Sequence, residues 1–512
     1  MLVKTFGSAV FGIRAIPVTV EVYMDQGIQF FMVGLPDNAV KESHQRIESA
    51  LRNNGYRIPG KKIIINMAPA DIRKEGSSYD LTIAMGILGA NEVIKTGRLE
   101  QYMIMGELSL DGGLLPIKGA LPIAIEARNR GFKGILLPSL NAQEASIVNG
   151  IDVYGITHLT EVIGFFNETL SILPTRINAQ EIFNHQVLQY ECDFADVRGQ
   201  ENIKRALEIA AAGGHNVILI GPPGAGKTML AKRLPSILPP LNLQEAMETT
   251  KIHSVAGKLN RQHSLITLRP FRAPHHTISN MALVGGGGIP QPGEISLAHN
   301  GVLFLDELPE FKRSVLEVLR QPMEDRVVTI SRARVTLEYP SSFMLVAAMN
   351  PCPCGYYNHP SMACQCAGGV VQKYINRISG PLFDRIDIHV EVVPVDYKKL
   401  SDCRQTEHSK VIRGRVIAAR QIQEKRYTGL TGIYCNSQLP SKMLRQVCSL
   451  SEAGNQLLKT AMDKLGLSAR AYDRILKVSR TIADLESSTE IKLEHLAEAI
   501  NYRSLDRDNW GK

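Results

Sequence analysis

The chain has 512 residues, of which 44% are hydrophobic and 21% are charged, and its formal net charge is +8. This length predicts about three domains, and the composition is typical of a globular protein with a buried core. No apolar run approaches the ~20 residues of a membrane-spanning helix, and the N-terminus lacks the layout of a signal peptide. We therefore expect a cytoplasmic protein with no membrane partner, whose mildly basic charge permits nucleic acid as a ligand without requiring it.

Strand and helix patterns alternate through residues 1–166. Residues 18–23 and 28–33, with Asp25-Gln-Gly27 between them, indicate a β-hairpin. Asp37 can cap a helix that runs to about Asn53. Later patterns predict a buried strand at 62–67, a buried helix at 81–88, a hairpin from 102–108 and 114–117, a helix from Ala120 and a strand at 134–138.

Segments of this domain resemble the proteolytic domain of Lon and its relative in the RadA recombination protein, an α+β fold of the ribosomal S5 domain 2 type. They are Ala68–Gly76, Gly106–Ile117 and Gly134–Pro138. The resemblance puts Ser78 at the position of Lon's serine, but Leu121 stands where the general-base lysine should lie. Lys118 is the substitute, about three residues out of register. Because a serine without a nearby base is a weak nucleophile, we expect a scaffold or DNA-associated role rather than peptidase activity.

A linker is expected at 167–191 and a core at 192–395, and the core contains a glycine-rich loop at 221–228. The loop lies between an apolar run at 216–220 and a helix-like run at 229–234, which is the strand–loop–helix context of a phosphate-binding loop. Lys227 would reach the β- and γ-phosphates of ATP, and Thr228 would hold Mg²⁺. The eight residues are Gly221, Pro222, Pro223, Gly224, Ala225, Gly226, Lys227 and Thr228.

Two further apolar strands end in polar residues suited to nucleotide chemistry. Residues 301–305 lead into Asp306 and Glu307, which would order Mg²⁺ and polarise the attacking water. Residues 343–349 lead into Asn350, which would contact the γ-phosphate or the water. These elements and the preceding Asp193–Gln200 resemble AAA+ ATPases, which implies an α/β core with a parallel sheet.

The segment Ser379–Asp387 resembles the arginine-finger segment of the magnesium-chelatase and minichromosome-maintenance AAA+ proteins. The resemblance implies that Arg385 reaches the nucleotide of a neighbouring subunit, with Arg377 as a second candidate, and hence that the chain forms a ring. A structural ion pair of Arg385 with a neighbouring aspartate, Asp384 or Asp387, is the alternative.

Two insertions interrupt this core. Residues 324–337 alternate as two short strands with Arg332 and Arg334 at the tip, where they could grip a phosphate backbone or form a solvated turn. His275 and His276 lie in the other insertion. Adjacent residues of a strand point to opposite faces, so we favour a structural or substrate-loop role over a metal site.

Four cysteines form two Cys-x-Cys pairs separated by nine residues. This spacing suits a tetrahedral structural Zn²⁺ site, and His359 between the pairs could replace one ligand. Four thiolate ligands would leave no open coordination position for catalysis. Disulfides are disfavoured in a reducing compartment. The four residues are Cys352, Cys354, Cys364 and Cys366.

Residues 396–512 have helical periodicity and are expected to form an all-α lid. From Lys410 to Tyr427 there are six Lys/Arg and one acidic residue, which a solvated helix face explains as well as nucleic-acid contact. Ser468 can cap a later helix. In its first turn, Arg470 matches the sensor-2 arginine of the chelatase-type AAA+ branch, and such a lid would close on nucleotide.

The order of the three domains resembles the YifB/ComM family of magnesium-chelatase-like proteins, notably in Pro292–Gly301 and Ser379–Ile388. The resemblance implies an ATP-driven hexameric motor acting on single-stranded or branched DNA, by helicase or branch-migration activity in recombination or natural transformation. A metal-chelatase motor subunit and a Lon-type ATP-dependent protease are the alternatives.

Overall fold

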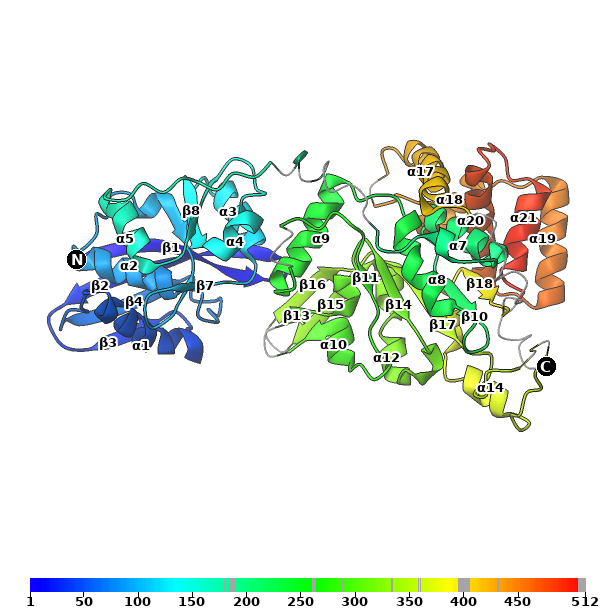
Figure 1. Ribbon diagram of the computed structural model, residues 1–512, viewed down its shortest axis with the longest axis horizontal. Helices are drawn as coiled ribbons and strands as arrows, with labels where there is room; N and C mark the ends of the chain where they lie inside the picture. Colours follow the sequence, from blue (N-terminus) through cyan, green and yellow to red (C-terminus); the bar gives the residue numbers. More distant parts are fainter. Residues whose placement is uncertain are drawn as a thin grey trace. The chain divides into compact units, whose positions relative to one another are not determined.

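The computed structural model describes residues 1–178, 180–181, 183, 190–259, 264–287, 290–332, 335–357, 359, 361–394, 406–430 and 432–504. The chain divides into two compact units (Figure 1). One consists of Met1–Val187 with Leu243–Thr267, and the other of Leu188–Asn242 with Leu268–Lys512. The domain boundaries expected at residues 166, 191 and 395 stay a prediction.

A seven-stranded mixed sheet organises the N-terminal unit. Its order is β3 (Phe30–Val33), β4 (Lys62–Ala68), β2 (Arg14–Asp25), β1 (Leu2–Phe11), β5 (Tyr102–Ile104), β8 (Gly134–Pro138) and β9 (Asp152–Ile156). The helices are α1 (Asn38–Asn53), α2 (Asp80–Ala90), α3 (Ala120–Asn129), α4 (Ser139–Ala145), α5 (Leu159–Asn167) and α9 (Leu243–Val255). Because α2 is apolar nearly all round, it is buried along its whole length and packs on β1 and β2.

Most elements expected in this unit are confirmed, including α1 with its cap, where Asp37 accepts a hydrogen bond from the N–H of Val40 at 2.8 Å. The hairpin expected from residues 18–23 and 28–33 is wrong. Strand β4 lies between β2 and β3, and β3 is parallel to β4. Parallel strands need a crossover connection, and α1 supplies the one between β3 and β4. Strand β4 thereby takes the place beside β2, so the turn-like segment after β2 does not join two neighbouring antiparallel strands. The later hairpin exists as β6 (Glu107–Leu108) and β7 (Leu114–Leu115).

A five-stranded, wholly parallel sheet forms the centre of the second unit. Its order is β11 (Phe271–Arg272), β14 (Val302–Leu305), β17 (Met344–Met349), β10 (Val217–Ile220) and β18 (Ile388–Glu391). The three central strands are buried throughout, as strands with both faces covered must be. Their carboxyl ends meet at one edge, which confirms the predicted P-loop sheet.

Shorter elements and the C-terminal helices complete this unit (Figure 1). Around the sheet lie α7 (Glu201–Gly213), α8 (Lys227–Arg233), α10 (Asn280–Val284), α11 (Glu294–Leu297), α12 (Arg313–Glu317), α13 (Arg320–Asp325), α14 (Val370–Ile375), α15 (Gly380–Phe383) and the two-residue strands β12 (Gly285–Gly286) and β13 (Gln291–Pro292). The C-terminal helices are α17 (Ser409–Arg426), α18 (Ser441–Val447), α19 (Glu452–Leu465), α20 (Ala469–Leu485) and α21 (Leu493–Asn501).

The hairpin predicted at 324–337 exists as β15 (Val327–Arg332) and β16 (Val335–Pro340). Its expected arginine grip, the side chains of Arg332 and Arg334, lies outside the described residues. Among the described helices, none has the length and apolarity needed to span a bilayer.

Candidate nucleotide site and cysteine cluster

The glycine-rich loop joins β10 to α8 as expected. Gly224 and Gly226 have φ of 78° and 88°, a left-handed region that favours glycine. At Gly221 a Cβ atom would lie 2.2 Å from the carbonyl oxygen of Val392, so only glycine lets the loop start this close to the chain after β18. The local sequence thus allows a tight loop whose amides can surround phosphate.

Lys227 lies at the first position of α8, with its ammonium held at the strand ends. Its Nζ donates to the carbonyl oxygens of Gly221 at 2.7 Å and Pro222 at 2.9 Å and to Oδ1 of Asn350 at 3.1 Å. Burial lowers the pKa of Lys227, while the charges of nearby carboxylates oppose this shift. Phosphate oxygens could replace these neutral acceptors and would favour the charged amine.

The predicted magnesium ligands meet directly. Oγ1 of Thr228 donates to Oδ2 of Asp306 at 2.6 Å. A hydroxyl and a carboxylate oxygen beside a phosphate site are the donor set that Mg²⁺ takes together with phosphate oxygens and water, so these residues fit the ion. Neighbouring strands therefore bring Lys227, Thr228, Asp306 and Asn350 together.

Glu307 lies just after β14 and has an unusual backbone conformation. Its φ is 52°, and its side chain is 57% exposed. Nδ1 of His276 lies 3.1 Å from its Oε2. The sequence analysis singled out His275 and His276 but did not predict that either contacts Glu307. The loop that holds the histidines and the loop that holds Glu307 come together because β11 pairs with β14.

The predicted arginine finger is buried within its own chain. Nη2 of Arg385 lies 2.7 Å from Oε1 of Glu324, and the Arg385 side chain is 7% exposed. An intramolecular ion pair therefore exists, with a partner on α13 that the sequence did not indicate. Arg377 is 53% exposed and pairs with Glu310 at 2.9 Å. Arg470 is exposed in the first turn of α20, where Ser468 forms the expected cap.

A buried polar network connects the C-terminal helices to the nucleotide sheet, and sequence reasoning missed it. Asp387 accepts the N–H of Asn216 at 3.0 Å and lies 3.0 Å from Nη1 of Arg474 on α20 and 3.3 Å from Nδ1 of His215. Burial alone would raise the pKa of Asp387, but Arg474 and His215 hold it below its ordinary range. The lid is thus bonded to a residue two positions after Arg385.

The basic helix α17 directs several of its cations into the protein. Nη1 of Arg413 donates to the carbonyl of Ser236 at 3.0 Å, and Arg415 contacts Glu208 and Glu407. At the end of the helix, Arg426 pairs with buried Asp484. In these four contacts Arg413, Arg415 and Arg426 have partners within the protein. Much of the positive charge for which the sequence allowed either solvent exposure or nucleic-acid contact is therefore paired inside the chain.

At the Lon-like position expected to hold a base, Leu121 is fully buried, and its N–H donates to Oε1 of Glu144 at 2.9 Å. The Lys118 side chain lies along Gly257, where an added Cβ would be 2.9 Å from the Lys118 Cε. The carbonyl of Ser78 accepts the N–H of Gly106 at 2.8 Å. Leu121 supplies no proton acceptor at this position.

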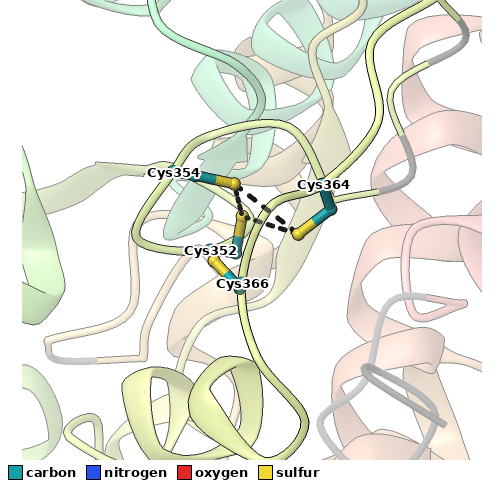
Figure 2. A group of neighbouring side chains, drawn as sticks. All are labelled: Cys352, Cys354, Cys364 and Cys366. Carbon is teal, nitrogen blue, oxygen red and sulfur yellow. Dashed lines mark hydrogen bonds between the residues drawn. The ribbon is translucent and has the colours of Figure 1, made fainter.

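The four cysteines of the two Cys-x-Cys pairs gather at one point (Figure 2), all sulfurs lying within 4.8 Å of one another. Sulfur distances are 3.2 Å for Cys352–Cys354, 3.7 Å for Cys352–Cys364 and 3.6 Å for Cys354–Cys364. A tetrahedron with zinc–sulfur bonds of ~2.3 Å has edges of about 3.8 Å, so the set fits Zn²⁺. Nδ1 of His359 instead accepts the amides of Ser361 and Met362.

Family comparisons match three consecutive parts of the chain. A model described as magnesium chelatase, subunit ChlI, matches residues 193–400, and a model of the ChlI C-terminal region matches 406–503. A third, described as subunit ChlI of Mg-chelatase, matches 20–141.

Curated relatives extend this similarity over the full length. YifB of Escherichia coli (strain K12) is 45% identical over 504 residues, 98% of this chain and 96% of the relative. Competence protein ComM of Haemophilus influenzae is 43% identical over 511 residues, 99% of this chain and 98% of the relative. Lon protease 2 of Bacillus subtilis is 34% identical over 154 residues, 27% of this chain and 26% of the relative. The chain therefore belongs to the YifB/ComM family of magnesium-chelatase-like AAA+ proteins.

Proposed function

We propose that this protein is a cytoplasmic ATPase that works as a homohexameric ring and remodels single-stranded or branched DNA by helicase or branch-migration activity. The main support for ATPase activity is that one edge of the sheet brings together Lys227, Thr228, Asp306 and Asn350. Phosphoryl transfer needs mainly positioning and charge, and this edge supplies both.

Each residue has one role in this proposal. Lys227 binds the β- and γ-phosphates, while Thr228 and Asp306 hold Mg²⁺, which would neutralise charge on the phosphates. Glu307 orients and polarises the attacking water, and Asn350 contacts the γ-phosphate or that water. Arg385 reaches the nucleotide of a neighbouring subunit, and Arg470 contacts the nucleotide from the C-terminal lid.

The cysteine cluster completes the proposal as a structural Zn²⁺ site. Soft thiolates select zinc over magnesium or calcium, and four of them leave no open position for catalysis. Cys352 is fully buried and Cys354, Cys364 and Cys366 are partly buried, so the metal would sit in the protein rather than on an open surface.

DNA as the substrate rests on the similarity to ComM, which is named a competence protein, and on the net charge of +8. A chelatase-type motor subunit is the second candidate, because the models matching 193–400 and 406–503 are named for magnesium chelatase. Porphyrin binding without DNA stimulation would favour this second candidate.

The decisive experiment compares ATP-dependent unwinding of a forked duplex and of a four-way junction by purified protein, with ATP hydrolysis measured on the same substrates. We expect hydrolysis to rise with DNA and to fall steeply with salt, since phosphate contacts release counterions. Lys227→Ala is the inactive control. A protein that stays monomeric with ATP and whose hydrolysis ignores every DNA would contradict the proposal.

A further inference from the structure

The cysteine-bearing loop packs directly on the phosphate-binding loop. Gly355 has φ of 86°, and a Cβ atom added there would lie 2.5 Å from Cδ and 3.2 Å from Cγ of Pro223. Both values are below the ordinary separation of two carbon atoms, which is about 3.5–4.0 Å. Gly355 comes directly after the ligand Cys354, so the second cysteine of the cluster and the contact with Pro223 are neighbours in the chain.

The first cysteine of the cluster is connected to the site from the other side. Asn350, whose Oδ1 accepts the Lys227 ammonium at 3.1 Å, is followed by Pro351 and then by the fully buried Cys352. Gly221 and Pro222 of the phosphate-binding loop line a small cavity together with Pro351, Gly355 and Tyr357 of the cysteine loop and with residues 391–394. The two loops thus border the same small space.

The order of the cysteine loop comes from local contacts, such as the amides of Ser361 and Met362 donating to Nδ1 of His359, rather than from a helix or strand. The described residues between the end of β17 at Met349 and the start of α14 at Val370 contain no helix or strand. Order in such a segment must come from side-chain contacts or from a bound ion, and a closed metal site contributes its binding free energy to folding. The four thiols are positioned to bind such an ion, and Figure 2 shows them facing one another across the loop.

We propose that the zinc-loaded cysteine cluster is a brace for the phosphate-binding loop, so that ATP affinity depends on zinc. Zinc holds Gly355 against Pro223 and Asn350 beside Lys227; without it, only a fraction of molecules keep the binding-competent loop, and the apparent dissociation constant for ATP rises by the inverse of that fraction. The inference rests on the proposed zinc site and adds to it a regulatory link between metal loading and the motor.

The test separates the metal from the contact by using the full-length protein and two glycine variants. Gly355→Ala keeps all four cysteines but places a methyl group into Pro223. Gly369→Ala is the matched control, because Gly369 has φ of 78° and nothing within 4 Å of its added Cβ, so it carries the same backbone strain without the clash. Zinc is measured by elemental analysis and affinity by a fluorescent ATP analogue.

We expect Gly355→Ala to retain zinc and to bind the analogue about tenfold more weakly than Gly369→Ala, which corresponds to a competent fraction of about one tenth. Cys366→Ser should lose zinc and affinity together, whereas Cys192→Ser, outside the cluster, should change neither. Circular dichroism checks that each variant is folded. Equal affinities of the two glycine variants, or zinc-free Cys366→Ser with normal affinity, would overturn the brace; wild-type protein without zinc would instead overturn the metal site itself.

Discussion

Nδ1 of His276 lies 3.1 Å from Oε2 of Glu307, the carboxylate proposed to act on the attacking water. The two residues come from loops that follow neighbouring parallel strands, β11 and β14. Glu307 is more than half exposed, so this contact is a main restraint on where its carboxylate points. We infer that the imidazole of His276 positions the Glu307 carboxylate.

Replacing His276 by alanine should therefore lower kcat for ATP hydrolysis several-fold and leave KM for ATP unchanged, because the phosphates are bound elsewhere. His275→Ala is the companion variant: Nδ1 of His275 contacts Oγ1 of Thr277, and its ring centroid lies 4.0 Å from that of His276, so it should lower kcat less than His276→Ala does. Steady-state kinetics with and without DNA give both constants. A parallel rise in KM, or an equal effect of the two histidine variants, would remove the assignment.

Glu307→Gln should bind ATP normally and hydrolyse it roughly 10²-fold or more slowly, because an amide cannot accept the proton of the attacking water. Bound but unhydrolysed ATP should hold the subunits together, which size-exclusion chromatography with light scattering can measure. Hydrolysis at the parental rate would show that another residue activates the water.

Arg385 can act across a subunit boundary only if it leaves its 2.7 Å ion pair with Glu324. We expect Arg385→Ala to abolish hydrolysis in a pure ring and to regain part of it when mixed with Lys227→Ala subunits. In such mixed rings an intact Arg385 meets an intact phosphate-binding loop. Glu324→Gln, which removes the partner and keeps the arginine, should remain active. If Glu324→Gln is as inactive as Arg385→Ala and mixing restores nothing, the arginine is structural.

Cys364→Ser should lose zinc and lower the thermal unfolding temperature by several degrees, because a structural metal stabilises the folded state by its own binding free energy. A strong chelator should reproduce the shift in the parental protein and have no further effect on the variant. Calorimetry and elemental analysis on one preparation give both values. An unchanged melting curve after complete zinc removal would contradict a structural role.

Asp387→Asn should lower the free energy of unfolding by roughly 3–5 kcal/mol, because it removes the buried carboxylate that pairs with the partly buried Arg474. Asp463→Asn, on the exposed side of α19, is the surface control. Since the folded pKa of Asp387 lies below its unfolded value, its stabilisation is present above pH ~4 and is lost as the pH falls through the folded pKa. Denaturant titrations at pH 7 and pH 3 should show a smaller difference between variant and parent at pH 3.

The nucleotide site was largely predictable because its chemistry is local. A glycine-rich loop after an apolar strand, and acids or amides at strand ends, require only that parallel strands finish at the same edge. Lys227, Thr228, Asp306 and Asn350 meet for this reason. The cysteine cluster was predictable too, since two close pairs bring four thiols together across one short loop.

Tertiary structure decided which residues from distant segments become neighbours. Nothing in the spacing of the chain places β4 between β2 and β3, pairs Arg385 with Glu324, sets His276 beside Glu307 or seats Gly355 on Pro223. Each of these contacts depends on strand order or on how loops pack, which a pattern of apolar and polar residues does not encode. Periodicity and motif chemistry determined the elements and the reacting groups, and long-range packing determined their partners.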